Sequence, residues 1–261
     1  MSQEIYRERG VFLPGLSYKG SLWNRVIQSL PVDKISTKTI DFPPYGSKYE
    51  SGRFDFDTFP QYLRDKLIEI DVQAPYFLIG HSLGGLVALK YTSRYPNDVA
   101  GLVLVSTPLR SPESKVPLIY RIATTAAVKF PIDSLIKRVL RANGKLIEAL
   151  RIKMITAGYV NPDFLKGSNM SSVARCHKDL FEHDFRNDIG KVENRALLIY
   201  GINDKPLLSI SGTELYASFR RGKVVIIDSN HSIPVNYPSL LGNLILEFIE
   251  NNKNKYNLVN R

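Results

Sequence analysis

Short, continuous runs of apolar residues recur along the chain, and most of them are separated by stretches with helical spacing. Because these runs do not alternate between apolar and polar positions, they are typical of strands buried on both faces of a mostly parallel sheet. The pattern predicts six strands, at residues 11–13, 37–40, 76–79, 102–105, 196–200 and 224–227.

Helices are predicted between several of these strands. Asp57 or Thr58 can cap a first helix, a second covers residues 83–94, and a third begins at Pro238, since proline is favoured at the first helical position. The last helix carries one apolar stripe, but its tail is polar from Asn251 onward and we expect it to fray. Alternating strands and helices predict an α/β fold with a mostly parallel, doubly wound sheet.

The alternation is interrupted after the fourth strand, where a long segment precedes the fifth. Two helices are predicted inside this segment, at residues 132–142 and 145–157, with Asn143-Gly144 between them. A segment of this size between two strands is typical of an inserted helical cap rather than a loop. We therefore expect two units: a core formed by residues 1–108 and 190–261, and a helical cap at 109–189.

Composition narrows the class of protein. The chain has 261 residues and is 44% hydrophobic and 23% charged, which is ordinary for a soluble globular protein and not for a disordered one. Its single cysteine excludes an internal disulfide and a cysteine-rich zinc site, and we predict neither a metal nor a cofactor. No secretory signal opens the sequence and no apolar run is long enough to span a membrane, so we expect a cytoplasmic location.

One glycine-rich turn carries the candidate chemistry. Residues 80–85 read Gly-His-Ser-Leu-Gly-Gly, directly after the predicted strand 76–79 and at the start of the predicted helix 83–94. This is the context of a nucleophile elbow, in which small residues two positions before and after the serine let neighbouring backbone come close. Ser82 is therefore the candidate nucleophile, and the context disfavours the alternative of an incidental serine in a glycine-rich turn.

A serine nucleophile needs a general base, and His231 is the candidate. It follows the last predicted strand, so it can reach over the carboxyl edge of the sheet toward Ser82. Asp204, after the fifth strand, is the candidate to orient the base, in the chain order serine, acid, histidine. Asp228 is the second choice, because a residue so near His231 more often forms a local turn. The other histidines are weaker candidates. His81 lies inside the elbow and is expected to point away from the serine hydroxyl, and His177 and His183 are interpreted as surface or cap-packing residues.

The tetrahedral intermediate of acyl transfer needs two backbone donors near the serine. The N–H group of Leu83, the residue after the nucleophile, is the first candidate. The second is expected in the loop after the strand at 11–13, and Leu16 is the candidate there.

These motifs and their order resemble the α/β-hydrolase fold superfamily, among its small cytosolic carboxylesterases with a helical cap. The resemblance covers nearly the whole chain outside the insertion, and it implies a serine hydrolase acting through Ser82, Asp204 and His231. It also implies hydrolysis of a carboxylic ester through an acyl-enzyme, with a thioesterase or lipase-like acyl hydrolase as the alternative. Three residues depart from the family pattern: Pro14 replaces the usual His, Asn230 the usual Gly before the catalytic His, and Asn236 a Glu after it.

The net charge of +10 is unusual, and much of it is concentrated in the predicted cap. Residues 109–158 hold ten Lys and Arg against three Asp and Glu. A basic cap over an apolar cleft suits an acyl chain on an acidic carrier, and the arrangement resembles the pimeloyl-acyl-carrier-protein methyl esterases of bacteria. Acyl carrier protein, coenzyme A or an anionic membrane surface would qualify as partner, and a solvated helix face is the plain alternative. The candidate docking residues are Arg138, Arg141 and Arg151.

Two other classes of function compete with that of an enzyme. Nucleic-acid binding fits the basic charge, but no zinc-finger, RNP or helix-turn-helix pattern occurs, so no nucleic-acid partner is predicted. A catalytically inert, hydrolase-like binding protein would lack a member of the triad, whereas this chain has all three residues. The predicted substrate is therefore a small-molecule or carrier-bound acyl ester.

Overall fold

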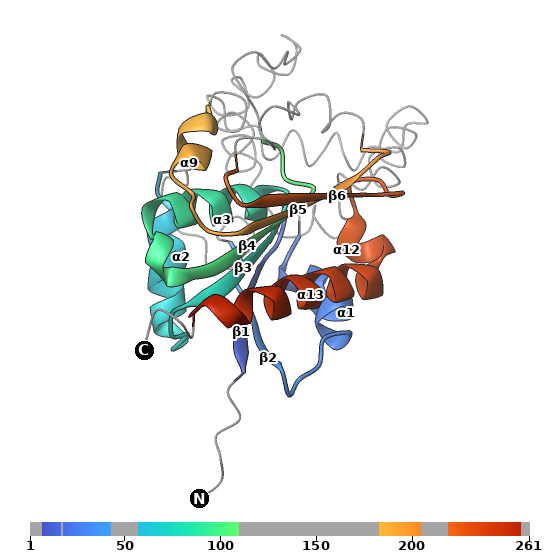
Figure 1. Ribbon diagram of the computed structural model, residues 1–261, viewed down its shortest axis with the longest axis horizontal. Helices are drawn as coiled ribbons and strands as arrows, with labels where there is room; N and C mark the ends of the chain where they lie inside the picture. The colour runs from blue at the N-terminus through green and yellow to red at the C-terminus, as the bar shows by residue number, and fades with distance from the viewer. Residues whose placement is uncertain (1–6, 17, 43–56, 110–182, 205–218, 257–261) are drawn as a thin grey trace, which may run out of the picture.

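A six-stranded parallel sheet forms the centre of the molecule in the computed structural model, which describes residues 7–16, 18–42, 57–109, 183–204 and 219–256 (Figure 1). The strand order is β2-β1-β3-β4-β5-β6, so the chain first builds outward to one edge and then crosses to the other. All six predicted strands are confirmed, most of them longer than the apolar run alone: β1 (Glu8–Leu13), β2 (Ile35–Thr39), β3 (Tyr76–His81), β4 (Val99–Val105), β5 (Ala196–Gly201) and β6 (Gly222–Ile227).

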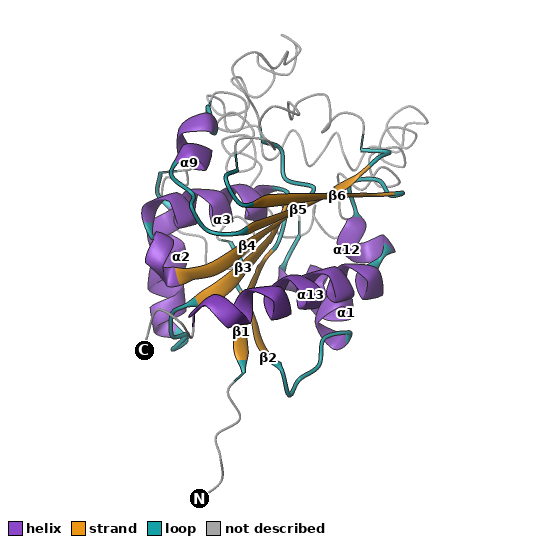
Figure 2. Cartoon of the chain, viewed as in Figure 1, coloured by secondary structure: helices purple, strands orange, loops and turns teal. Residues whose placement is uncertain are grey.

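Helices cover both faces of the sheet (Figure 2). The described helical elements are η1 (Gly20–Trp23), α1 (Asn24–Gln28), α2 (Phe59–Glu69), α3 (Leu83–Arg94), η3 (Pro96–Asp98), α9 (Arg186–Gly190), α12 (Ile233–Asn236) and α13 (Pro238–Tyr256). Helices α2, α3 and α9 contribute to one apolar cluster, and η1, α1, α12 and α13 to a second. The two clusters lie on opposite faces of the sheet, which makes the core a doubly wound α/β structure as predicted.

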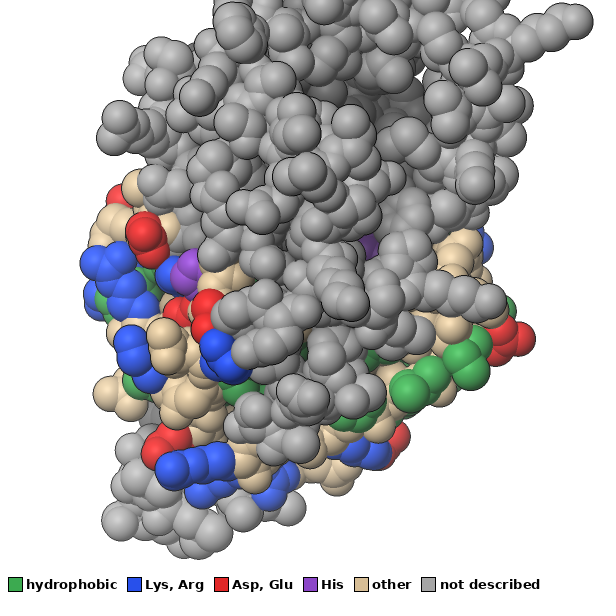
Figure 3. All heavy atoms as spheres, turned by 90° about the horizontal axis from the view of Figure 1, so that it is seen from above, with side chains coloured by type: hydrophobic (Ala, Val, Ile, Leu, Met, Phe, Trp, Pro, Cys, Tyr) green, Lys and Arg blue, Asp and Glu red, His purple; other side chains and the backbone are tan. Residues whose placement is uncertain are grey.

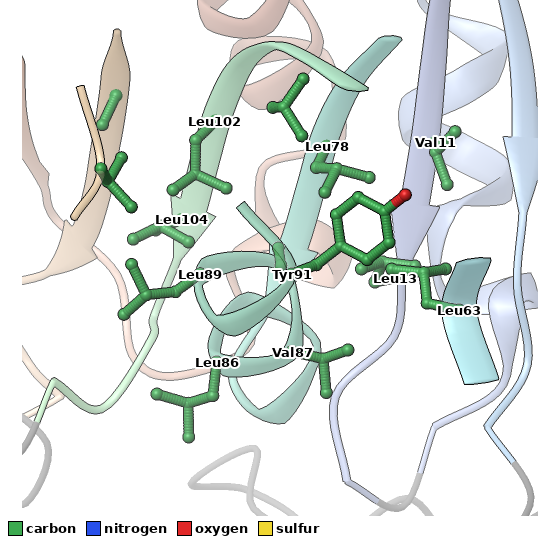
Figure 4. Close-up of a cluster of buried hydrophobic side chains, with 14 of the residues drawn as sticks. Val11, Leu13, Leu63, Leu78, Leu86, Val87, Leu89, Tyr91, Leu102 and Leu104 are labelled. Carbon is green, nitrogen blue, oxygen red and sulfur yellow. The ribbon is translucent and has the colours of Figure 1, made fainter. Parts of the chain in front are cut away.

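The apolar runs are explained by the position of each strand in the sheet. Strands β3, β4 and β5 lie in the interior of the sheet, and all of their residues are buried. Figure 4 shows the cluster on the α3 face, where Leu78 and Leu102 from the sheet meet Leu86, Leu89 and Tyr91 from α3. This rigid centre carries the loops at the carboxyl ends of β3, β5 and β6.

Two expectations are wrong in part. The edge strands β2 and β6 are not buried on both faces, and Ile226 of β6 is 59% exposed because an edge strand has only one neighbouring strand. The polar tail of the last helix does not fray at Asn251, because α13 continues to Tyr256. There Asn252 is buried, and its side-chain amide donates to the carbonyl of Phe248, so a polar side chain supports the helix instead of ending it.

Most of the predicted cap, including the helices expected at 132–142 and 145–157, lies outside the described residues. The division into core and cap therefore stays a prediction. On the described surface, Lys and Arg side chains are interspersed with Asp and Glu (Figure 3). Across the described ranges, none of the helices combines the length and the apolar character that crossing a bilayer requires.

Candidate active site

Ser82 lies in the turn between β3 and α3 with a backbone conformation that is rare for an L-amino acid. Its φ of 51° and ψ of −116° place it outside the regions that a side chain favours. The backbone holds it there, because its N–H donates to the carbonyl of Val105 at 2.8 Å and its carbonyl accepts from the N–H of Gly85 at 3.0 Å. The turn thereby presents a partly exposed serine at the first turn of a helix.

The glycines around Ser82 are required by close backbone packing. A Cβ atom on Gly80 would overlap the backbone of Gly84 and Gly85. A Cβ atom on Gly84 would overlap the carbonyl oxygens of Leu13, the last residue of β1, and of Pro14, the first residue of the loop after it. The spacing of small residues therefore lets β3, α3 and the β1 loop meet at one point.

Asp204 and His231 form a buried hydrogen-bonded pair. The Nδ1 atom of His231 lies 2.7 Å from Oδ2 of Asp204, and the two residues are 6% and 1% exposed. Asp204 follows β5 and His231 follows β6, so two neighbouring parallel strands deliver both groups to the same edge of the sheet. The carboxylate of Asp228 has a different partner, because it accepts a hydrogen bond from the side-chain amide of Asn203 at 2.7 Å. The structure thus brings Asp204, rather than Asp228, to His231.

The loop that carries His231 is held by two of the three residues that depart from the family pattern. The side-chain oxygen of Asn230 accepts a hydrogen bond from the N–H of Ser232 at 3.0 Å and one from the amide of Asn236 at 2.9 Å. The two asparagines, one before and one after His231 in the sequence, therefore contact each other. Their pairing gives a local reason why the loop keeps its shape without the usual glycine and glutamate.

The two candidate oxyanion donors lie on elements that meet beside Ser82. Leu83 is the first residue of α3, and the N–H groups of a helix's first turn have no partner within the helix. Leu16 lies in the loop after β1, next to Gly15, where a Cβ atom would be 3.3 Å from Cβ of Ser82. Both backbone segments therefore flank the serine, as an oxyanion site requires.

His81 makes a contact with the site that the sequence does not reveal. The Nε2 atom of His81 lies 2.9 Å from the backbone carbonyl oxygen of His231, and the centroids of the two imidazole rings are 5.0 Å apart. Burial, reinforced by the neighbouring His231, lowers the pKa of His81 to about 3, so its ring is neutral. The sequence signal was a polar residue at the end of a buried strand, which does not reveal its partner.

A second polar cluster fastens α9 to α3, away from Ser82. Asp188 is bound by His183 at 2.6 Å and by the hydroxyl of Ser93 at 3.2 Å, and Lys90 lies 3.2 Å from the same histidine nitrogen. Burial acts to raise the pKa of Asp188, but the hydrogen bond from His183 and the charge of Lys90 outweigh it and lower the pKa. This cluster explains His183 as a packing residue at the end of the insertion.

Among the described residues, a hollow outside the site and the titratable side chains offer no further binding group. A hollow of about 590 Å³ lies at the amino ends of β5 and β6, lined by Arg195, Arg221 and Phe248 among others, at the opposite edge of the sheet from Asp204. Within the described ranges, no three His, Cys, Asp or Glu side chains are gathered as a metal ion would need. The predicted docking residues Arg138, Arg141 and Arg151, and also His177, lie outside the described part of the chain.

The parallel sheet, the serine on a strained turn between β3 and α3, and a histidine–aspartate pair beyond β5 and β6 together define the α/β-hydrolase class of serine hydrolases. Comparison with known families agrees. The family model described as serine aminopeptidase, S33, matches residues 11–217, and the chain belongs to this hydrolase family.

Known relatives are similar over most of their length. Monoacylglycerol lipase ABHD6 of Mus musculus is 23% identical over 253 residues, which cover 92% of this chain and 74% of the relative. The pimeloyl-[acyl-carrier protein] methyl ester esterase of Chromobacterium violaceum is 26% identical over 203 residues, covering 74% and 75%. The crystal structure of a bromoperoxidase from Bacillus anthracis superposes with a TM-score of 0.74 at 20% identity, covering 94% of this chain and 92% of that one.

Proposed function

We propose that the protein is an esterase that hydrolyses carboxylic esters of acyl chains, with Ser82 as nucleophile, His231 as general base and Asp204 as the group that orients the base. The observation that carries the proposal is the strained Ser82 turn beside the buried His231–Asp204 pair at 2.7 Å. A carboxylate on Nδ1 favours the tautomer with the proton there, so Nε2 is the unprotonated nitrogen that takes the proton of the serine.

The first half of the reaction acylates the enzyme. His231 Nε2 takes the proton of the Ser82 hydroxyl while the serine oxygen attacks the ester carbonyl carbon. The carbonyl π electrons move to its oxygen, which the N–H groups of Leu83 and Leu16 stabilise as an oxyanion. When the intermediate collapses, the bond to the alcohol oxygen breaks, and the imidazolium of His231 gives its proton to the departing alcohol.

The second half releases the acid and restores the serine. His231 takes a proton from water, and the resulting hydroxide oxygen attacks the acyl carbon bound to Ser82. The new oxyanion lies at the same backbone donors. Its collapse breaks the bond to the serine oxygen, which recovers its proton from His231, and the carboxylic acid leaves.

Ester substrates are supported by the relatives, because two of them carry names that describe ester hydrolysis, of monoacylglycerols and of a pimeloyl methyl ester on a carrier protein. Within this class we propose an acyl chain on an acidic carrier such as acyl carrier protein. The support is the excess of ten cations over three anions at residues 109–158, which would attract an acidic partner. A lipase-like reaction on free acylglycerols and a thioesterase reaction are the competing substrate choices.

The test of the proposed reaction is covalent and kinetic. A fluorophosphonate probe should label Ser82 in the wild-type protein, as located by peptide mass spectrometry, and Ser82→Ala should lose both labelling and turnover of p-nitrophenyl acyl esters. Parallel assays with an acyl thioester, a monoacylglycerol and an aminoacyl p-nitroanilide rank the leaving groups. A wild-type protein that folds but neither reacts with the probe nor hydrolyses any of these substrates would be an inert binding protein.

The carrier proposal has its own test. The double variant Arg138→Glu with Arg141→Glu should lower kcat/KM on a methyl ester carried by acyl carrier protein about tenfold or more, because it inverts two charges of the docking surface. Turnover of p-nitrophenyl butyrate, which has no carrier, is the matched control and should stay the same. Equal kcat/KM on the carrier-bound ester would contradict docking through these residues.

A further inference from the structure

His81 joins three parts of the site that are distant in sequence. It is the last residue of β3 and the residue before Ser82, and it is 1% exposed. Its ring contacts the loop after β1, because a Cβ atom on Gly15 would be 2.6 Å from its Nδ1, and the ring of Tyr18 meets it edge-on at 5.9 Å. Its Nε2 reaches the loop after β6 at the carbonyl oxygen of His231.

The last of these contacts defines the proton on the ring. A carbonyl oxygen only accepts hydrogen bonds, so Nε2 of His81 carries the hydrogen and donates it to His231. Nδ1 is then the unprotonated nitrogen, and among the described residues it has no hydrogen-bond partner. The single polar function of this buried ring is therefore its bond to the backbone of His231.

The bond links two parts of the site that the sheet does not connect directly. Strand β6 is separated from β3 by β4 and β5, so no ladder hydrogen bond links the strand that precedes Ser82 to the strand that precedes His231. Asp204 fixes the imidazole of His231 through Nδ1. His81 bonds to the backbone of the same residue, so the two contacts together restrain the ring and the backbone of His231.

From this geometry we propose that His81 is a positioning residue: by donating its Nε2–H to the carbonyl of His231, it holds that histidine at the distance and angle from Ser82 that proton transfer needs. The proposal rests on the proposed function, since it assigns the setting of the same base. The neutral state of His81 serves this role, because an imidazolium 5.0 Å from the ring of His231 would oppose the positive charge that the base acquires during reaction.

A buried histidine can also simply fill space, and the two roles need different things. Space filling is served by an apolar side chain of similar size, whereas positioning needs a donor that reaches the carbonyl of His231. Glutamine places an amide N–H near the position of histidine Nε2. Asparagine is polar but shorter, so its amide falls near the position of Nδ1. Comparing the glutamine and asparagine variants therefore shows whether the site needs a donor at the position of Nε2 or only a polar side chain.

The experiment compares His81→Leu, His81→Asn and His81→Gln with the wild-type protein. The readouts are the rate constant for fluorophosphonate labelling of Ser82, and kcat and KM on one p-nitrophenyl ester. Misplacement of the base should lower the labelling rate and kcat of the Leu and Asn variants about tenfold to a hundredfold, with KM changed little. His81→Gln should stay within about threefold of the wild type, because it restores the donated bond.

A matched control separates lost stability from lost positioning. Thr92 of α3 is also fully buried, and its hydroxyl donates to the carbonyl of Ala88 at 2.7 Å. Thr92→Val therefore removes one buried hydrogen bond on the adjacent helix, and its labelling rate should equal that of the wild type. The folded fraction of every variant is checked by circular dichroism.

The outcomes are distinct. If the wild type labels and His81→Leu labels equally fast, His81 only fills space and the proposal is wrong. If folded His81→Gln loses as much rate as folded His81→Asn, the donated bond is not what positions His231, and the proposal is again wrong. If the wild type itself does not label at Ser82, the proposed hydrolase function fails, independently of the ranking among the His81 variants.

Discussion

Replacing Ser82 by glycine should stabilise the fold while abolishing the reaction. Ser82 has a φ of 51° and a ψ of −116°, where a Cβ atom crowds the backbone but glycine is unstrained. A residue held in such a region costs about 1–3 kcal/mol. Ser82→Ala keeps the Cβ atom and therefore keeps the strain, so the two variants differ only in the presence of that atom.

The expected size follows from two opposing effects. Glycine removes strain of about 1–3 kcal/mol from the folded state. It also adds conformational freedom to the unfolded chain, which costs about 0.5–1 kcal/mol. We therefore expect Ser82→Gly to be more stable than Ser82→Ala by about 1 kcal/mol, and by no more than about 2.5 kcal/mol. In a protein of this length, a difference of about 1 kcal/mol raises Tm by roughly 2–4 °C.

The chain offers its own probe and control. Trp23 is the single tryptophan and is fully buried, so its fluorescence reports urea unfolding. Asp71 also has a positive φ, of 52°, in the turn after α2, but aspartate tolerates this conformation better than most residues, so Asp71→Gly should gain less. If Ser82→Gly is instead less stable than Ser82→Ala, by the ordinary penalty for glycine, the turn is not strained and the reasoning is wrong.

Three further predictions follow from the contacts of the site. Asp204→Asn should lower kcat by about three to four orders of magnitude through the wrong histidine tautomer, and Asp228→Asn should change it less than about twofold; a reversed result in ester assays would move the acid role to Asp228. Gly84→Ala should abolish soluble folded protein, because its Cβ atom overlaps two backbone carbonyls, whereas Gly190→Ala, with open space around it, should match the wild-type Tm in thermal unfolding. In the folded state the pKa of His81 is lowered from 6.5 to about 3. Between these two pH values the unfolded chain binds a proton on His81 and the folded protein does not. The free energy of unfolding is therefore unaffected by His81 above about pH 6.5 and decreases as the pH falls toward 3. In urea titrations at pH 6 and pH 4, the wild type should lose about 1.4 kcal/mol of unfolding free energy per pH unit through His81, and His81→Gln should lack this loss. An equal change in unfolding free energy with pH for both proteins would contradict the prediction.

The fold was predictable because its signals are local. Continuous apolar runs such as 76–79 and 196–200 report strands buried on both sides, and the structure places both in the interior of the sheet. The same reasoning overstated β6, since a run of Val and Ile reads alike in an interior strand and at an edge. It also ended the last helix too early, because the buried contact of Asn252 that supports its end is invisible in a hydropathy pattern.

The candidate site was predictable to the extent that the chemistry requires fixed residue types after fixed elements. Ser82 follows β3, Asp204 follows β5 and His231 follows β6, and parallel strands bring these ends to one edge. The choice of Asp204 over Asp228 relied on chain order. The structure supplies the physical reason: the carboxylate of Asp228 accepts a hydrogen bond from Asn203, whereas that of Asp204 accepts one from His231.

What the sequence could not give is the set of contacts that hold these ends in place, because each joins residues far apart in the chain. His81 and His231 are 150 positions apart, and nothing in either residue's neighbourhood indicates a bond from one side chain to the other's backbone. Asn230 and Asn236 read separately as two departures from a family pattern, yet in the structure one amide binds the other. The residues that perform a reaction are constrained in type and are visible in a sequence, whereas those that hold them need only a donor at the right point in space. Several side chains can supply such a donor, so supporting residues are found from geometry and tested by substitutions, such as His81→Gln, that change the residue and keep the donor.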